Sequence, residues 1–429
     1  MRIVVHDYAG HPFPVQLSRE LARREHTVLH AFAGGLLTPR GVLQRVAGDA
    51  PTLDFAEVPM SPQYRANKYS FLKRRGYEAA YGRELASLLE RTLPDLIISG
   101  QTPTEPQWTM IRIARQLGVP VVTWVQDFYS VAVEKLARRK LPLVGALAGW
   151  WYRYLDGKCL RASAGIVAIT EDFVPILARF GVPTERVTVI PNWAPLDELP
   201  LRPRHNPWSA RHGLDDKLVF LYSGTLAMKH NPDLLRRLAV RFRDDATVRV
   251  VVISEGPGAD YLRERKGVEN LRNLELLPFQ PFEDMPDVLA AADVLVAVLE
   301  ADAGVFSVPS KVLSYHCAGR AILAAISARN LAARIIHSEA SGICVEPQDV
   351  QGFLLRAAEL RQDAALRARS GRSARAYAEK HFDVKAIADQ FEVVFRRCAG
   401  GLVAAPGAKR PADRAPGVLG VSSAPDSGT

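Results

Sequence analysis

Short runs of consecutive hydrophobic residues alternate in the first half of the chain with segments whose apolar residues are three or four positions apart. Such runs are typical of buried strands, and the spaced pattern is typical of helices with one buried face. The expected strands are Arg2–His6, Thr27–Phe32, Leu96–Ser99, Val119–Val125, Gly165–Ile169 and Val187–Ile190. The expected helices are Pro14–Arg24, Tyr77–Arg91 and Glu105–Leu117. Strands separated by helices predict a parallel, doubly wound α/β sheet.

The second half repeats this alternation after a proline-rich break between Pro191 and Pro207. Strands are expected to begin at Leu218, Arg249, Leu274, Val294, Ala321 and Gly342, and the last helices are expected over Val350–Arg375 and Val384–Arg397. The predicted units are an N-terminal domain (1–195), a linker (196–216), a second domain (217–375) and a C-terminal helix (376–399). The segment 400–429 is rich in Gly, Ala, Pro and Ser, and we expect it to be disordered because it cannot bury enough apolar surface.

Size and composition agree with two globular domains. The chain has 429 residues, of which 48% are hydrophobic and 24% charged. The cysteines at 159, 317, 344 and 398 are too scattered to suggest a zinc site or a disulfide framework, which fits a reducing cytoplasm. No signal peptide is expected at the N-terminus, and no stretch approaches the roughly 20 apolar residues that span a bilayer.

The net charge of +9 is unevenly distributed. Lys135–Arg161 is strongly basic and encloses the run LPLVGALAGWWY, while Arg65–Arg83 mixes basic and aromatic residues. Three interpretations are open: contact with a membrane interface, a solvated helix face with Trp150 and Trp151 in the core, and nucleic-acid binding. We favour peripheral contact with an anionic membrane through residues 135–161, and expect no nucleic-acid partner.

A candidate anion site follows the strand that begins at Leu218. Ser223, Gly224 and Thr225 allow close approach of a ligand, Asn231-Pro232 is suited to starting a helix, and Lys229 adds positive charge. Unpaired N–H groups at a helix N-terminus bind phosphate well. The alternative is an ordinary strand-to-helix turn with a surface lysine.

Two further turns in the same half resemble this one. Glu255-Gly256-Pro257-Gly258 follows one strand, and Val308-Pro309-Ser310-Lys311 comes after another. In an open parallel sheet, ligands bind beyond the carboxyl ends of the strands, so we expect the three loops to converge.

The chain resembles a retaining GT-B glycosyltransferase of the family 4 type found in bacterial exopolysaccharide and colanic-acid assembly. The resemblance covers roughly residues 1–397. It rests on the motifs Val125-Gln126-Asp127, Val189-Ile190-Pro191-Asn192-Trp193, Tyr222-Ser223-Gly224 with Lys229, Glu255-Gly256-Pro257, Phe279-Gln280-Pro281, Pro309-Ser310-Lys311 and Ala318-Gly319-Arg320-Ala321-Ile322, in this order. It implies two Rossmann-like domains facing a central cleft, with the C-terminal helix packing back on the N-terminal domain.

The resemblance also implies a role for each wall of that cleft. The N-terminal domain would bind the acceptor and the second domain a nucleotide sugar, with Asp127 and Lys229 as catalytic candidates. The donor candidates are Gly10, Gly224, Thr225, Lys229, Glu255, Gly256, Phe279, Pro309, Ser310 and Lys311. The acceptor candidates are His6, His11, Gln126 and Asp127. His6 and His11 could equally be structural, and Asp127 could be a helix N-cap.

Three departures from the family pattern concern the donor. Many members carry two glutamates spaced E-x7-E, where this chain has Phe306 and Ser314. The first-domain glycine pair is reduced to Gly10 followed by His11, and Thr225 stands where an arginine often follows the strand-end glycine.

Lys229, Lys311 and the helix N-termini remain to stabilise the departing diphosphate, so we expect sugar transfer with retention and without a metal or another cofactor. A hexosyltransferase acting on a lipid-linked or oligosaccharide acceptor, at the cytoplasmic face of the membrane, is the favoured function. A non-catalytic scaffold and a sugar-nucleotide epimerase are the alternatives.

Overall fold

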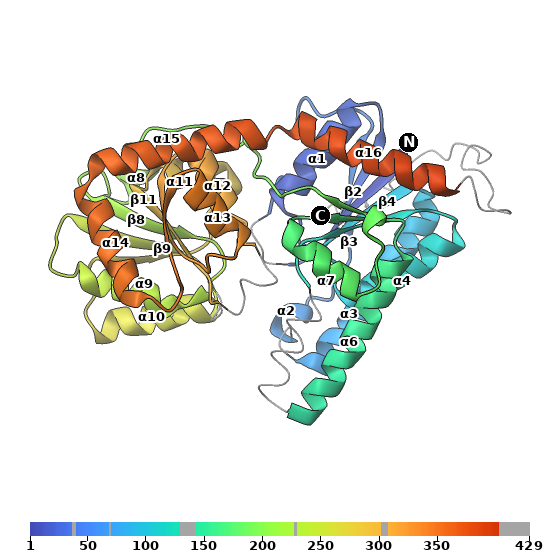
Figure 1. The fold of residues 1–429 in the computed structure, drawn as a ribbon, viewed down its shortest axis with the longest axis horizontal. Helices are drawn as coiled ribbons and strands as arrows, with labels where there is room; N and C mark the ends of the chain where they lie inside the picture. The colour runs from blue at the N-terminus through green and yellow to red at the C-terminus, as the bar shows by residue number, and fades with distance from the viewer. Residues whose placement is uncertain (37–39, 68–69, 129–141, 227–229, 302–307, 403–429) are drawn as a thin grey trace, which may run out of the picture.

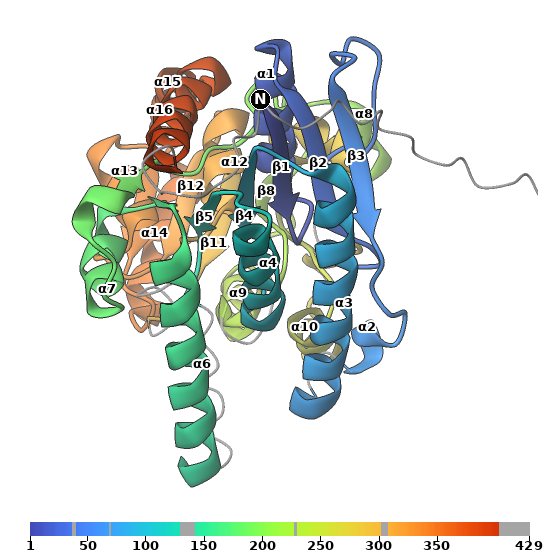
Figure 2. The ribbon, with the colours of Figure 1, turned by 90° about the vertical axis from the view of Figure 1, so that its right-hand side faces the viewer.

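The computed structural model describes residues 1–36, 40–67, 70–128, 142–226, 230–301 and 308–402. These residues form two α/β units, and the last two helices run across the top of both of them (Figure 1). Each unit contains one parallel sheet with helices on its faces (Figures 1 and 2). The predicted fold class, two doubly wound parallel sheets, is confirmed.

The N-terminal sheet has the strand order β3-β2-β1-β4-β5-β6-β7. Its strands are β1 (Arg2–Asp7), β2 (Thr27–Ala33), β3 (Leu53–Val58), β4 (Leu96–Gly100), β5 (Val121–Val125), β6 (Gly165–Ala168) and β7 (Val187–Val189). Its helices are α1 (Pro12–Arg23), α2 (Tyr64–Asn67), α3 (Phe71–Thr92), α4 (Thr104–Gln116), α6 (Pro142–Ala162) and α7 (Val174–Arg179). The sequence analysis missed β3, an edge strand whose middle residues are only partly buried and which therefore lacks a continuous hydrophobic run.

The second sheet has the equivalent order β10-β9-β8-β11-β12-β13. Its strands are β8 (Leu218–Ser223), β9 (Val248–Ile253), β10 (Leu274–Leu277), β11 (Val294–Val298), β12 (Ala321–Ala325) and β13 (Gly342–Val345). Its helices are α8 (Pro207–Arg211), α9 (Pro232–Arg241), α10 (Pro257–Val268), α11 (Met285–Ala290), α12 (Lys311–Ala318), α13 (Leu331–Ser338) and α14 (Val350–Gln362). All six strands begin within a residue of the positions that the hydrophobic pattern indicated.

Two helices carry the chain back to the first unit. The long helix expected over Val350–Arg375 is broken at Asp363, whose side chain accepts a hydrogen bond from the Leu366 N–H and caps α15 (Ala364–His381). The boundary expected at residue 375 therefore falls inside α15. α16 (Val384–Leu402) lies on the N-terminal unit, where Phe391 packs against Trp124 and Arg24 forms an ion pair with Asp389 at 2.6 Å. Residues 403–429 of the predicted disordered tail lie outside the described residues.

The strand orders determine where a ligand can bind. In each sheet the chain reverses its winding direction at one point, between β1 and β4 in the first sheet and between β8 and β11 in the second. The loops on the two sides of such a point separate and leave a crevice at the carboxyl edge. Within the described ranges, no helix is both long and apolar enough to cross a bilayer.

Candidate functional site

A cleft of about 620 Å³ lies between the two units at these switch points. One wall comes from the N-terminus of α1, from Arg40, from the residues that follow β4, β5 and β6, and from the segment 192–199. The other wall comes from the end of β8, the segment before α11 and the N-terminus of α12. Both sheets therefore present their carboxyl edges to one shared cleft.

The turn after β8 forms part of the second-domain wall. Ser223, Gly224 and Thr225 line the cleft, and Gly224 has a φ of 119°, a conformation that side-chain-bearing residues rarely adopt. The Tyr315 hydroxyl accepts a hydrogen bond from the Ser223 N–H at 3.1 Å, and the Tyr222 hydroxyl donates one to the Thr225 carbonyl at 2.7 Å. Two buried tyrosines thus hold the turn in place.

Lys311 brings a positive charge to this turn. It is the first residue of α12, and its ammonium group lies 3.5 Å from the centre of the Tyr222 ring. A Cβ atom added to Gly224 would lie 3.6 Å from Lys311 Nζ, so the turn and the cation are in close proximity. Pro309 and Ser310 place the N-terminus of α12 in the same wall, where the helix dipole favours an anion.

A third segment, Phe279–Phe282, completes this wall. Gln280 is fixed there, because its Oε1 accepts a hydrogen bond from Trp208 Nε1 at 3.1 Å and its Nε2 donates one to the Pro278 carbonyl at 2.9 Å. The partly exposed Phe279 and Phe282 provide flat apolar surface beside a region suited to phosphate.

The opposite wall begins at the N-terminus of α1. His11 lines the cleft, and its backbone N–H donates a hydrogen bond to the buried carboxylate of Asp7. The imidazole Nδ1 of His11 lies 3.6 Å from the other Asp7 oxygen. Burial acts to raise the pKa of Asp7, but the charge and hydrogen bonds of His11 outweigh it and leave this pKa below its usual value. Asp7 is therefore a buried anion that orients His11.

Side chains from β4 and β5 continue this wall. Gln101 has a φ of 53°, which is uncommon for a residue other than glycine, and its Nε2 donates a hydrogen bond to Gln126 Oε1 at 2.7 Å. The buried Nε2 of Gln126 has no hydrogen-bond partner among the described residues. Asp127 follows and is exposed to the cleft. A buried amide donor beside an accessible carboxylate is suited to binding hydroxyl groups of a sugar.

Arg40 is a cleft residue that the sequence analysis missed. Its guanidinium lies over the Phe32 ring, 5.7 Å from the ring centre, and Nη2 donates a hydrogen bond to the Ala33 carbonyl at 2.6 Å. Burial lowers the pKa of Arg40, against the opposing charges of Glu57 and Asp7. No motif surrounds this residue, and only folding of the segment after β2 brings it to the site.

Comparison with known families agrees with this architecture. Residues 12–193 match the family described as "Glycosyl transferase 4-like domain", and residues 217–363 match "Glycosyl transferases group 1". The two matches together cover most of the chain, and the boundary between them falls in the linker. The chain belongs to the GT4/group 1 glycosyltransferases.

Several individual proteins are similar to this glycosyltransferase. A putative colanic acid biosynthesis glycosyl transferase, WcaI of Escherichia coli K12, is 27% identical over 215 residues, which are 49% of this chain and 52% of WcaI. The match thus spans about half of that curated relative. Anabaena Alr3699/HepE, solved with UDP-glucose, has a TM-score of 0.67 at 15% identity and covers 92% of this chain and 99% of its own. Sucrose-phosphate synthase from Thermosynechococcus elongatus has a TM-score of 0.70 at 14% identity and covers 94% of this chain and 100% of its own.

Most residues proposed for the site of this GT4 protein lie in one place. The structure brings together the candidates His11, Gln126, Asp127, Gly224, Thr225, Phe279, Pro309, Ser310 and Lys311 as cleft residues. Ser314, which stands where many family members have a glutamate, also lines the cleft. Their individual roles stay predictions. Lys229 and Phe306 lie outside the described residues.

Four candidates do not line the cleft. His6 is buried, and its ring nitrogens are hydrogen-bonded to the Tyr81 hydroxyl at 2.7 Å and to the Thr102 hydroxyl at 2.9 Å, which corresponds to the structural alternative. Gly10 lies behind His11, where its carbonyl accepts a hydrogen bond from the Gly41 N–H. Glu255 and Gly256 are exposed and do not line the cleft, although Ile253 at the end of β9 does. The expected convergence of three loops is thus limited to two.

The described part of the chain contains no group of three His, Cys, Asp or Glu side chains that could hold a metal ion. Metal independence stays a prediction. It rests on the lysine and the helix N-terminus at the proposed diphosphate site rather than on this absence.

Proposed function

We propose that the protein transfers a hexosyl group from a nucleoside-diphosphate sugar to an acceptor hydroxyl, with retention of configuration. The main support is the difference between the two walls of one cleft. The second-domain wall offers Lys311, the Gly224 turn and a helix N-terminus, all suited to a diphosphate. The N-terminal wall offers Gln126 and Asp127, which are suited to a sugar hydroxyl.

A uridine nucleotide is the donor that we favour. The turn of Phe279–Phe282 would bind the base, and the N-terminus of α12 at Ser310 would bind the diphosphate beside the Gly224 turn, whose own N–H donates to the Ile253 carbonyl. HepE, a structural neighbour, was solved with UDP-glucose, which supports a uridine donor. Position 314 is a serine, so the glutamate expected to hold the donor ribose in many family members is absent here.

The proposed chemistry needs two complementary charges. Cleavage of the sugar–phosphate bond places negative charge on the leaving diphosphate, and Lys311, together with Lys229, would stabilise it. Asp127 would orient the acceptor hydroxyl or remove its proton. The acceptor attacks from the face that the diphosphate leaves, so no covalent carboxylate intermediate is required.

A nucleotide-sugar panel tests this function. We expect one UDP-sugar to raise the melting temperature, since a ligand that binds only the native state stabilises it. With acceptor present, release of UDP should follow and should persist in excess EDTA. Stabilisation without turnover would indicate a scaffold, and conversion of the donor without any acceptor would indicate an epimerase. Loss of activity in EDTA that magnesium or manganese restores would contradict the metal-independent mechanism.

We further propose that the acceptor is a lipid-linked sugar at the cytoplasmic face of the membrane. α6 extends beyond the body of the N-terminal domain (Figure 2) and exposes Leu147, Trp150, Trp151 and Tyr154, whose exposed fractions are 68, 55, 39 and 44%. The alternative that Trp150 and Trp151 are core residues is wrong. Exposed tryptophans beside basic residues are typical of proteins that lie at a membrane interface. Lys135–Lys140 lie outside the described residues.

Liposome sedimentation tests this contact. Wild-type protein should pellet with anionic vesicles at low salt, and added salt should weaken the binding. The double variant Trp150→Ser/Trp151→Ser should remain in the supernatant. A matched control, Val268→Ser/Leu355→Ser, removes exposed apolar residues from the second domain and should behave as wild type. Failure of wild type to pellet would favour a water-soluble acceptor and would leave the proposed sugar transfer intact.

A further inference from the structure

A second hollow lies at the opposite, amino edge of the second sheet. It has a volume of about 570 Å³, within the range of small-molecule sites. Its walls are the turns that precede β11 and β12, the linker residues Leu201 and Arg204, and one face of α15. Gly319 and Gly371 allow α15 to pack closely there, since a Cβ added to Gly371 would lie 2.4 Å from the Gly319 carbonyl oxygen.

Positive charge dominates this hollow. It is lined by five arginines and two carboxylates: Arg204, Arg320, Arg367, Arg372, Arg375, Asp293 and Glu379. Asp293 accepts a hydrogen bond from Arg204 Nε at 3.1 Å, and Glu379 accepts one from Arg375 Nε at 2.7 Å. Both carboxylates are thus already paired within the wall.

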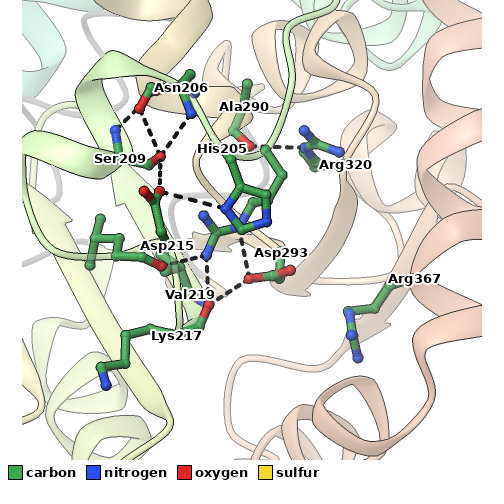
Figure 3. Close-up of polar contacts among 12 residues, drawn as sticks. His205, Asn206, Ser209, Asp215, Lys217, Val219, Ala290, Asp293, Arg320 and Arg367 are labelled. Atoms are coloured by element: carbon green, nitrogen blue, oxygen red, sulfur yellow. Dashed lines mark hydrogen bonds and ion pairs between the residues drawn. The ribbon is translucent and has the colours of Figure 1, made fainter.

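The other three arginines have no carboxylate within ion-pair distance among the described residues. Arg320 donates to the carbonyls of Ala290 and Arg202, each at 3.1 Å, and Arg367 Nη1 donates to the carbonyls of Leu360 and Arg361. These bonds fix both guanidinium groups without neutralising them. Figure 3 shows Arg320 and Arg367 on different elements, and Arg372 adds an exposed guanidinium from α15.

Two further observations concern the burial of these guanidinium groups. The Nη1 atom of Arg204 is buried without a hydrogen-bond partner in the described structure. Burial lowers the pKa of Arg320, and the charge of Asp293 raises this pKa more than the charge of Arg204 lowers it. Burying a guanidinium away from water is unfavourable, so a bound anion would stabilise the native state.

We propose that this arginine hollow binds a soluble phosphorylated molecule about the size of a sugar phosphate. Guanidinium groups bind phosphate through paired N–H donors, and the arginines of the hollow come from the linker, from the turn before β12 and from α15. The small residues Ala292, Ala321 and Ala368 leave room for a sugar beside it. This ligand site is separate from the cleft at the carboxyl edge.

The position of the hollow suggests a regulatory role for such a ligand. The chain passes between the two domains twice, through the linker before α8 and again between α15 and α16. Arg204 lies on the first crossing and Arg367 and Arg372 on the helix that leads to the second, so a bound phosphate would tie both crossings to the second sheet. The ligand would therefore favour the arrangement of the two domains in which these elements lie together.

Isothermal titration calorimetry with glucose 6-phosphate and inorganic phosphate tests the proposal. Lys311→Met protein serves as the background, so that binding in the cleft is weakened. Arg372→Glu removes a proposed contact, while Arg369→Glu makes the same charge change at an exposed position of α15 that does not line the hollow. We expect Arg372→Glu to weaken glucose 6-phosphate binding about tenfold or more, as for loss of one charged hydrogen-bonding group, and Arg369→Glu to have little effect.

Several results would overturn the proposal. If the two variants bound glucose 6-phosphate with equal affinity, the binding would be nonspecific charge attraction. If the protein bound neither glucose 6-phosphate nor inorganic phosphate, the arginines would have a structural role only. Arg372-dependent binding of phosphatidylglycerol vesicles alone would assign the hollow to lipid headgroups, and binding of a poly-glutamate peptide alone would assign it to a protein partner. In the expected case, glucose 6-phosphate also protects residues 199–204 and 364–379 from hydrogen exchange, which simple charge screening would not do.

Discussion

The two walls of the cleft are constructed by different means. On the second-domain wall, the Gly224 turn lets the chain approach the cleft closely, and the N-terminus of α12 and one lysine provide the positive charge. On the N-terminal wall, side chains dominate, and they come from strand ends and from the segment after β2: His11, Arg40, Gln101, Gln126 and Asp127. The first wall is suited to a group that every donor shares, the diphosphate, whereas the second is suited to a particular pattern of hydroxyl groups.

This difference predicts how substitutions on each wall should change turnover. A change on the second-domain wall should lower turnover whatever the acceptor, because it affects the leaving group. A change on the N-terminal wall should depend on the acceptor. The predictions below separate these two kinds of effect.

The largest effect is expected for Lys311→Met, which retains most of the side-chain volume but removes the charge. Turnover should fall by about 10²–10³, since one fixed donor at a developing anion contributes about that much. Lys380→Met, an exposed lysine near the end of α15, is the control. Initial rates of UDP release measure the effect. Unchanged turnover in Lys311→Met would remove this lysine from the diphosphate site.

Asp127→Asn should lower turnover by about 10² if the carboxylate acts on the acceptor proton. The asparagine also tests the structural alternative, because Asn and Asp are equally good helix N-caps. We expect an unchanged melting temperature and loss of the acid limb of the pH–rate profile. Full activity in this variant would assign Asp127 a capping role only.

Acidification should lower the stability of the N-terminal domain more than that of the second domain. Burial lowers the pKa of His6 and His30 in the N-terminal sheet, and of His316 in α12, to about 4 from an ordinary value of 6.5. Between these values the unfolded chain binds protons that the folded protein does not. The contribution of these histidines to the free energy of unfolding is therefore fully present above pH 6.5 and is lost as the pH falls toward 4. Each of these histidines should lower the free energy of unfolding by about 2 kcal/mol when the pH falls from 7 to 5.

Hydrogen-exchange protection factors at pH 7 and pH 5 measure this difference. Strands β1 and β2 should lose more protection than β11 and β12. An equal loss in both sheets would show that the two domains unfold as one unit, or that the buried histidines do not control acid stability.

The smallest effect is expected for Gln126→Met. Loss of the buried amide should raise the KM for the acceptor about tenfold, while the KM for the donor and the slow hydrolysis of donor by water should change little. Gln348→Met, a glutamine beyond the end of β13, is the control. A raised KM for the donor would show that Gln126 contacts the donor instead of the acceptor, and would contradict the proposed difference between the walls.

Much of the fold follows from local pattern. The strands of the second sheet and most of those in the first are hydrophobic runs, because a strand in a parallel sheet is covered on both faces. The turn around Gly224 and the segment Pro309–Lys311 were also predictable, since a glycine turn and a helix start use neighbouring residues. The edge strand β3 and the break at Asp363 were missed because partial burial and a single capping residue leave little signal.

The sequence by itself determined the fold class, the division into two domains and the family, since each depends on residues near one another along the chain. Only the tertiary structure decided which strand ends meet. It brought Arg40 and Gln101 to the cleft, left Glu255 outside it, buried His6 and exposed Trp150. It also assembled the arginine hollow from the linker, two strand starts and α15. The physical reason is that strand order and helix packing depend on contacts between distant residues, which periodicity and short motifs do not record.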